Sequence, residues 1–170
     1  SFKIIGGVEL SGTVIPQGAK NEALQVISAT LLTKEKIIIE NIPLISDVIC
    51  LIELLKGLGV KIEKIKKHSY SFEAKNIKLD YLKSSDFKNK SQKIRGSVMI
   101  LGPLLARFKK ARLYPPGGDK IGRRRLDTHF VGLSKLGAKF KFINKKFYKV
   151  YADQLIGSHI LLEEASVTGT

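Results

Sequence analysis

The chain has 170 residues, of which 44% are hydrophobic and 26% charged, a balance typical of a soluble globular protein. No apolar run approaches the roughly 20 residues of a membrane helix, and the N-terminus lacks the layout of a signal peptide. A single cysteine, Cys50, excludes an internal disulfide framework, and the three histidines show no metal-ligand spacing. We therefore expect a cytoplasmic protein with no metal or other cofactor.

The net charge of +15 is the most unusual total, and its two contributors are distributed differently. Lysines are scattered along the chain, as expected of solvated surface. All six arginines lie between positions 95 and 125. Because the planar guanidinium matches phosphate and carboxylate groups, this clustering indicates an anionic ligand.

The predicted elements start with a strand and a turn in the first ten residues. Residues 21–33 have the composition and apolar spacing of a helix, and residues 36–40 are expected to be a buried strand. A second amphipathic helix, capped by Ser46, is expected to run to about Leu58. A glycine stop and two short strands joined by a polar turn follow, up to residue 74.

The same order of elements returns in the second half of the chain. Residues 55–74 match residues 133–152 at a constant offset of 78. Helices are expected at about 92–107 and 125–136, with the polar residues 80–91 as a connector. A repeat of this length indicates a repeated α/β unit. The coinciding residues are Leu55/Leu133, Leu58/Leu136, Gly59/Gly137, Lys61/Lys139, Ile65/Ile143, Tyr70/Tyr148 and Ala74/Ala152.

The repeat divides the chain into parts. Residues 20–90 are expected to form the first unit, residues 91–162 the second, and residues 163–170 the truncated start of a third. Residues 1–19 precede the first unit. A third unit that begins without being completed indicates a fragment of something longer.

Basic residues stand at the predicted helix starts, where the helix dipole favours acidic ones. Lys20 begins the first helix, Arg95 lies in the first turn of its counterpart, and residues 123–125 are all arginine. A bound anion would remove this conflict, because backbone N–H groups and cations would then point at one ligand. The alternative is a set of exposed basic residues that each cost a few tenths of a kcal/mol.

Residues 115–125, PPGGDKIGRRR, are typical of a phosphate-holding loop at the start of a helix. Gly117 and Gly118 let the backbone approach a ligand closely. The P-loop and dinucleotide-binding fingerprints are both absent. Asp119 is the one acid in the loop, and the residues alone favour an ion pair with Lys120 or Arg123.

Three further residues have both a functional and a structural interpretation. Asp127 is suited to accept hydrogen bonds from a sugar or uracil, or to serve as a helix N-terminal acid. His129 is expected to be a satisfied structural histidine. Cys50, on the apolar helix of the first unit, is expected to be a core residue.

Three motifs are specific when they are taken together: Gly18-Ala19-Lys20-Asn21, Arg95-Gly96-Ser97 followed by Leu101-Gly102-Pro103, and Pro116-Gly117-Gly118 through His129. In combination they resemble the UDP-N-acetylglucosamine 1-carboxyvinyltransferases, the enolpyruvyl transferases that open bacterial peptidoglycan synthesis. The resemblance implies an α/β fold, an inside-out barrel of repeated βαβαββ units, which is incomplete in this chain. It also implies that residues 1–19 belong partly to a second domain and that the active site lies between the two domains.

The resemblance implies roles for individual residues. Lys20 and Asn21 match the pair that contacts phosphoenolpyruvate and the sugar, and Lys20 is also expected to be catalytic. Arg95 matches a ligand-contacting arginine, and Arg124 matches the loop arginine that binds phosphate. The other expected substrate-binding residues fall where the family binds the UDP-sugar: Arg125, Leu126, Asp127, Thr128, Ser166 and Val167.

Asp119 takes the position of the family's loop cysteine, the proposed proton donor. The reaction adds the sugar 3′-hydroxyl to C2 of phosphoenolpyruvate, with protonation at C3, and then eliminates phosphate. We expect Asp119 to be the general acid only in the closed, liganded enzyme, where ligand charge and desolvation favour a protonated carboxyl group. Two other positions depart from the family: Arg125, where proline is usual, and Glu164, where lysine is common.

The resemblance implies phosphoenolpyruvate and UDP-N-acetylglucosamine as partners, with no nucleic acid and no membrane. The fragment alone is expected to be inactive, because the other domain supplies the remaining site groups. Two alternatives stay open. Enolpyruvyl transfer to shikimate 3-phosphate is disfavoured by Asn21 and the stretch around Asp127. A basic nucleic-acid-binding module is disfavoured because aromatic stacking motifs are lacking.

Overall fold

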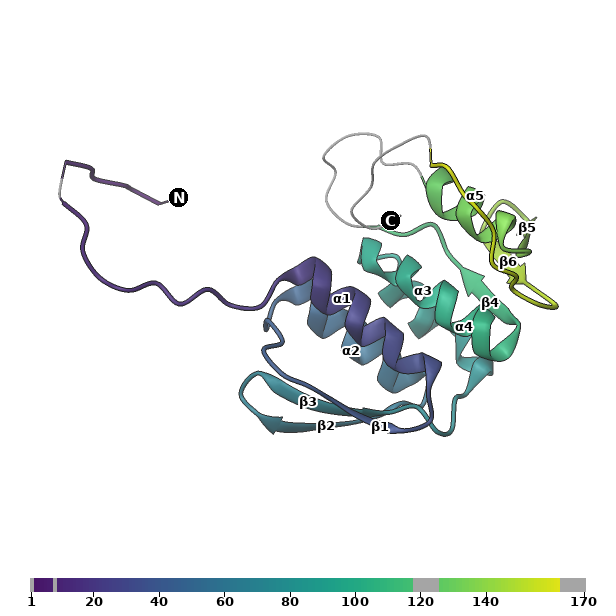
Figure 1. The fold of residues 1–170 in the computed structure, drawn as a ribbon, viewed down its shortest axis with the longest axis horizontal. Helices are drawn as coiled ribbons and strands as arrows, with labels where there is room; N and C mark the ends of the chain where they lie inside the picture. The colour runs from purple at the N-terminus through teal and green to yellow at the C-terminus, as the bar shows by residue number, and fades with distance from the viewer. Residues whose placement is uncertain (1, 8, 118–125, 163–170) are drawn as a thin grey trace.

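The computed structural model describes residues 2–7, 9–117 and 126–162. Two units with the same order of elements follow one another (Figure 1). The first unit contains α1 (Lys20–Ala29), the 3-10 helix η1 (Thr30–Leu32), β1 (Lys36–Ile39), α2 (Ser46–Gly57), β2 (Lys61–Lys66) and β3 (Ser69–Glu73). The second unit contains η3 (Arg95–Ile100), α4 (Leu101–Phe108), β4 (Lys110–Leu113), α5 (Asp127–Lys135), β5 (Lys139–Ile143) and β6 (Phe147–Tyr151). The two units are joined by η2 (Leu79–Lys83) and α3 (Ser85–Ser91).

Each unit contributes one antiparallel sheet of three strands, in the orders β1-β3-β2 and β4-β6-β5. The pairing is equivalent in the two sheets, since Lys61 opposes Glu73 and Lys139 opposes Tyr151. Both pairs keep the offset of 78 found in the sequence. The predicted repeated α/β unit is therefore confirmed in the backbone pairing, while the boundaries at residues 90 and 162 remain a prediction.

The helices of the two units pack together, and the sheets lie on the outside of the helical layer (Figure 1). Apolar residues at helical spacing make this possible, because they form a continuous stripe along each helix. The resulting core is one hydrophobic cluster that includes residues of both units. Its most deeply buried side chains include Ile27, Leu31, Leu51, Leu54, Leu55, Leu101, Leu104 and Leu105.

Glycines end the second helix of each unit, as the sequence predicted. Gly59 follows α2 with φ of 94°, and Gly137 follows α5 with φ of 106°. This left-handed conformation is accessible to glycine at little cost, and it turns the chain from the helix into the next strand. Both units therefore enter their β-hairpins in the same way.

Two local expectations in the first unit were wrong. β1 is not a buried strand: the sheet turns one face to solvent, and the Ile38 side chain is 58% exposed. Ser46 is the first residue of α2 and not its cap, which is Ile45. Residues 80–91 do connect the two units, as expected, and they are largely helical. Ser84 caps α3 by accepting a hydrogen bond from the Phe87 backbone at 3.0 Å, and the Phe87 ring is buried.

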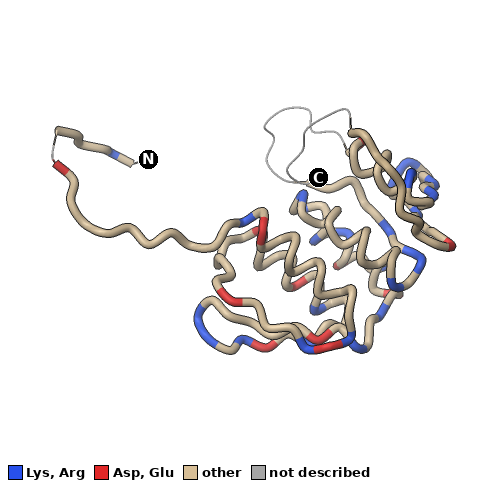
Figure 2. Tube along the Cα trace, in the orientation of Figure 1, with Lys and Arg blue, Asp and Glu red and all other residues tan. Residues whose placement is uncertain are grey.

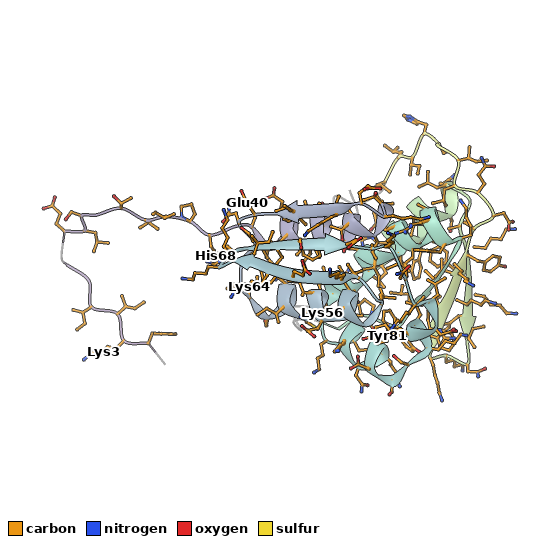
Figure 3. All side chains as sticks on the ribbon, turned by 90° about the horizontal axis from the view of Figure 1, so that it is seen from below. Lys3, Glu40, Lys56, Lys64, His68 and Tyr81 are labelled. Carbon is orange, nitrogen blue, oxygen red and sulfur yellow. The ribbon has the colours of Figure 1, made fainter. Side chains whose placement is uncertain are left out.

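Residues 2–7 and 9–19 form an arm without helix or strand that extends away from the body (Figure 1). Figure 3 shows Lys3 near its tip, while Glu40, Lys64 and His68 lie at one end of the first sheet. Apolar side chains on the arm are exposed, with Phe2 at 99%. Their placement against a second domain remains a prediction. Among the described helices, none is long and apolar enough to span a bilayer.

Candidate functional site

The start of the glycine-rich loop is fixed against the segment that leads to Arg95. A Cβ atom added at Gly117 would overlap the carbonyl oxygen of Gln92, so only glycine fits this approach. Gln92 lies three residues before Arg95 in the sequence. Asp119, Arg124 and Arg125 lie outside the described residues. The described part of the chain thus brings the loop to the predicted arginine.

The Arg95-Gly96-Ser97 motif has a separate structural function for each residue. Arg95 is the first residue of η3 and is half-buried. Gly96 is buried, and a Cβ atom there would lie 2.9 Å from Cδ1 of Leu24 on α1. The buried Ser97 hydroxyl donates to the carbonyl oxygen of Ser91 at 2.8 Å. Gly96 and Ser97 therefore hold Arg95 between α1 and the end of α3.

Lys20 and Asn21 form the exposed start of α1. Gly18 sets this start, because a Cβ atom there would overlap the carbonyl oxygen of Asn41. Lys20 Nζ donates to Oδ2 of Asp47 at 3.3 Å, and Asp47 lies in the first turn of α2. The two helices therefore begin side by side, with a partly exposed ion pair joining them. The positive start of α1 found in the sequence thus has a carboxylate beside it.

The start of α5 contains the other described site residues. Leu126 is the half-buried residue before the helix, Asp127 is its exposed first residue, and Thr128 is half-buried. Thr128 and His129 line a cavity of about 470 Å³ between α5, α1, the η3–α4 segment and residues 160–162. Ser166 and Val167 lie outside the described residues.

The environment of His129 differs from the one that the sequence predicted. Its Nε2 atom is buried and has no hydrogen-bond partner among the described residues, so the expectation of a satisfied structural histidine was wrong. Burial lowers the pKa of His129, and the positive charge of Arg95 lowers it further. The neutral imidazole is therefore favoured, and the start of η3 lies within electrostatic range of the start of α5.

The cavity does not include every predicted residue. On α1 it is lined by Gln25, Ser28 and Ala29, in the second half of the helix. Lys20 lies five residues before Gln25, the nearest of these, which is about 7.5 Å along a helix axis. The structure therefore brings Arg95, Thr128 and His129 into one region and leaves Lys20 at the α1–α2 end.

The described residues contain no group of three or more His, Cys, Asp or Glu that would hold a metal ion. Cys50 is only half-buried, and its thiol donates to the carbonyl oxygen of Lys90 at 3.7 Å. Burial raises the pKa of the Cys50 thiol, which disfavours the nucleophilic thiolate. The chemistry of the described site is therefore that of cationic groups and hydrogen-bond donors.

The sequence and the fold are similar to those of known proteins. A sequence profile of the family described as EPSP synthase (3-phosphoshikimate 1-carboxyvinyltransferase) matches residues 4–170. The chain is 56% identical over 171 residues to a UDP-N-acetylglucosamine 1-carboxyvinyltransferase of Bacteroides thetaiotaomicron, covering 100% of this chain and 39% of that protein. It is 54% identical over 171 residues to the protein of the same name from Bacteroides fragilis, with the same coverage.

Among solved structures, the enolpyruvyl transferase NikO from Streptomyces tendae has a similar fold, with a TM-score of 0.70 and 20% sequence identity. The similarity covers 88% of this chain and 32% of that chain. It confirms the predicted fold class, an incomplete set of the repeated α/β units of enolpyruvyl transferases. The chain spans about two fifths of the length of the curated relatives it matches. It belongs to the EPSP synthase (3-phosphoshikimate 1-carboxyvinyltransferase) family.

Proposed function

We propose that the complete enzyme carrying this sequence transfers the enolpyruvyl group of phosphoenolpyruvate to the 3′-hydroxyl of UDP-N-acetylglucosamine and releases phosphate. Relatives that are more than half identical to the chain are named UDP-N-acetylglucosamine 1-carboxyvinyltransferase, after this reaction. The step would be the first committed one of bacterial peptidoglycan synthesis, in the cytoplasm. No metal or cofactor is required by this proposal.

The observation that carries the proposal is the approach of Gly117 to Gln92. It brings the start of the loop to the backbone of Gln92, three residues before Arg95, and the charge of Arg95 acts on His129 at the start of α5. Both substrates are anionic at their phosphate groups, and guanidinium groups bind phosphate through paired hydrogen bonds. Arg95, near the start of the loop, therefore suits the binding of such a phosphate group.

The proposed residue roles follow the order of the reaction. Arg95 and Arg124 bind phosphate, and Lys20 with Asn21 contacts phosphoenolpyruvate and the sugar. Asp119 donates the proton to C3 while the 3′-hydroxyl adds to C2. The remaining residues contact the UDP-sugar: Arg125, Leu126, Asp127, Thr128, Ser166 and Val167. We add His129 to this set, because it lines the same cavity as Thr128 and its Nε2 has no hydrogen-bond partner among the described residues.

Phosphate release by the complete enzyme tests the proposal. Phosphoenolpyruvate is supplied with UDP-N-acetylglucosamine in one arm and with shikimate 3-phosphate in the other. Phosphate release that depends on UDP-N-acetylglucosamine supports the proposal. Release only with shikimate 3-phosphate would assign the other activity of the family and overturn it.

A further inference from the structure

The outward faces of the two sheets differ in charge, although the backbone pairing of the sheets is equivalent. In the first sheet the face carries Lys36 and Lys61 together with Glu63 and Glu73. Glu63 forms ion pairs with Lys36 at 3.5 Å and with Lys61 at 3.0 Å. Positive and negative charges are therefore balanced on this face. Figure 2 shows blue and red segments side by side along the first sheet.

The equivalent face of the second sheet carries cations without interspersed acids. We call it the basic sheet face, and its side chains are exposed or half-buried while Ala111, Leu113 and Val150 on the opposite face are buried. The sequence contains no Asp or Glu between Asp127 and Asp153. The basic sheet face consists of Lys110, Arg112, Lys139, Lys141 and Lys149, with Ile143, Phe147 and Tyr151 among them.

Three of these cations form one row across the sheet. Arg112 opposes Lys149 on one side, and Lys141 opposes it on the other. Directly opposed side chains have Cβ atoms about 5 Å apart, and like charges in such pairs destabilise a sheet. The equivalent row of the first unit is Ile38, Ser71 and Glu63. The row costs stability, and a bound polyanion would remove that cost.

Nearby carboxylates neutralise little of this charge. Lys139 lies 3.8 Å from Asp153, whose side chain is 93% exposed. Asp80 lines a hollow with Lys110, Arg112 and Lys149, but its hydrogen bond is to Lys83 at 2.6 Å. Lys83 is the main cause that lowers the pKa of Asp80, and Lys110 contributes less. The row of three has no carboxylate opposed to it in the strand pairing.

The aromatic rings of the face are associated with cations. The Arg112 guanidinium lies 4.0 Å from the centroid of the Phe147 ring, and Lys139 Nζ lies 6.0 Å from that of Tyr151. Rings covered in this way are poor platforms for stacked nucleobases, which disfavours single-stranded nucleic acid. Lysine ammonium groups on flexible stems suit a fluid layer of phosphates better than a ligand of fixed geometry.

We propose that the basic sheet face binds the phosphate headgroups of an anionic membrane surface. Each lysine or arginine near such a surface adds to the attraction, and the contact is reversible and screened by salt. This proposed peripheral contact differs from the sequence-based expectation of no membrane partner. It does not depend on the proposed function.

The test uses the full-length protein carrying this sequence in co-sedimentation with vesicles. Vesicles of phosphatidylcholine alone are compared with vesicles that contain about one third phosphatidylglycerol, at low salt and at about 0.5 M salt. The variant Lys141→Glu/Lys149→Ser introduces the residue types of the first unit at the equivalent positions. The matched control Lys75→Glu/Lys88→Ser makes the same change in net charge at exposed lysines outside the face.

We expect binding only to the anionic vesicles, loss of binding at high salt, and a fall of at least about tenfold in Lys141→Glu/Lys149→Ser. The control is expected to bind like the parent. Thermal unfolding checks the fold of each variant, and Lys149→Ser alone serves if the double variant does not fold. Equal losses in variant and control would overturn the proposal. The proposal would also be overturned if the parent protein bound single-stranded RNA but not vesicles, and if Lys141→Glu/Lys149→Ser abolished the RNA binding.

Discussion

Gly117 packs directly against the carbonyl oxygen of Gln92, and this contact joins the loop to the arginine at the start of η3. It is made between two backbones, so a flexible side chain cannot move aside to accommodate a Cβ atom. The position of the loop relative to Arg95 therefore depends on the absence of a Cβ atom at Gly117.

Gly117→Ala is expected to destabilise the chain by roughly 1–3 kcal/mol, because an added methyl group forces backbone shifts in a packed region. The measurement is the free energy of unfolding in urea. Gly102→Ala is the matched control, since a Cβ atom at this helical glycine of α4 would meet nothing within 4 Å. The control is expected to be neutral or slightly stabilising. Equal destabilisation by the two substitutions would contradict the proposed contact.

Lys20→Ala is expected to reduce activity far more than stability. Its ion pair with Asp47 is partly exposed, and such pairs contribute about 0–1 kcal/mol. A charged hydrogen bond to substrate is worth more, so kcat/KM of the complete enzyme should fall at least about tenfold. Lys56→Ala breaks a similar exposed pair with Glu53 on α2 and should preserve activity. An equal loss of kcat/KM in both variants would contradict a role of Lys20 in substrate binding.

His129 should make the fold less stable in mild acid. Its pKa in the folded chain is lowered, so below about 6.5 the unfolded chain binds the proton more readily than the folded one. This contribution to stability is present above the unfolded pKa and is lost as pH falls through the folded value. Urea unfolding on both sides of that window should show a smaller pH difference in His129→Gln than in the parent. The exposed His159 provides the control His159→Gln, which should behave like the parent.

Much of the fold could be predicted because its signals are local. Gly59 and Gly137 end helices through their own conformational freedom, and apolar spacing marks the buried stripe of α2. α3 was missed because a short polar helix depends on a single cap at Ser84 and one buried ring at Phe87. Lysine and serine dominate this part of the sequence, so neither the cap nor the buried ring gives a clear helix signal.

The candidate site was predictable only in part. Arg95 could be found because a cation at a helix start breaks a local rule. The burial of His129 could not, since it requires α1, the η3–α4 segment and residues 160–162 to close around α5. The partner of Lys20 was hidden for the same reason, because Asp47 is 27 residues away in the chain.

Asp119→Asn tests the proposed proton donor. The amide cannot donate a carboxyl proton, so the limb of the pH–rate profile that reports the acid should disappear, and kcat should fall by roughly 100-fold or more. Substrate affinity measured by titration should change much less. An unchanged pH–rate profile in the complete enzyme would remove Asp119 from this role.

Identification of the product by mass spectrometry tests the central claim most directly. The complete enzyme carrying this sequence is incubated with phosphoenolpyruvate and an equal mixture of UDP-N-acetylglucosamine and shikimate 3-phosphate. We predict a single product, UDP-N-acetylglucosamine carrying one enolpyruvyl group on its 3′-oxygen, formed together with one phosphate. An enolpyruvyl group found on shikimate 3-phosphate, with UDP-N-acetylglucosamine unchanged, would contradict the account.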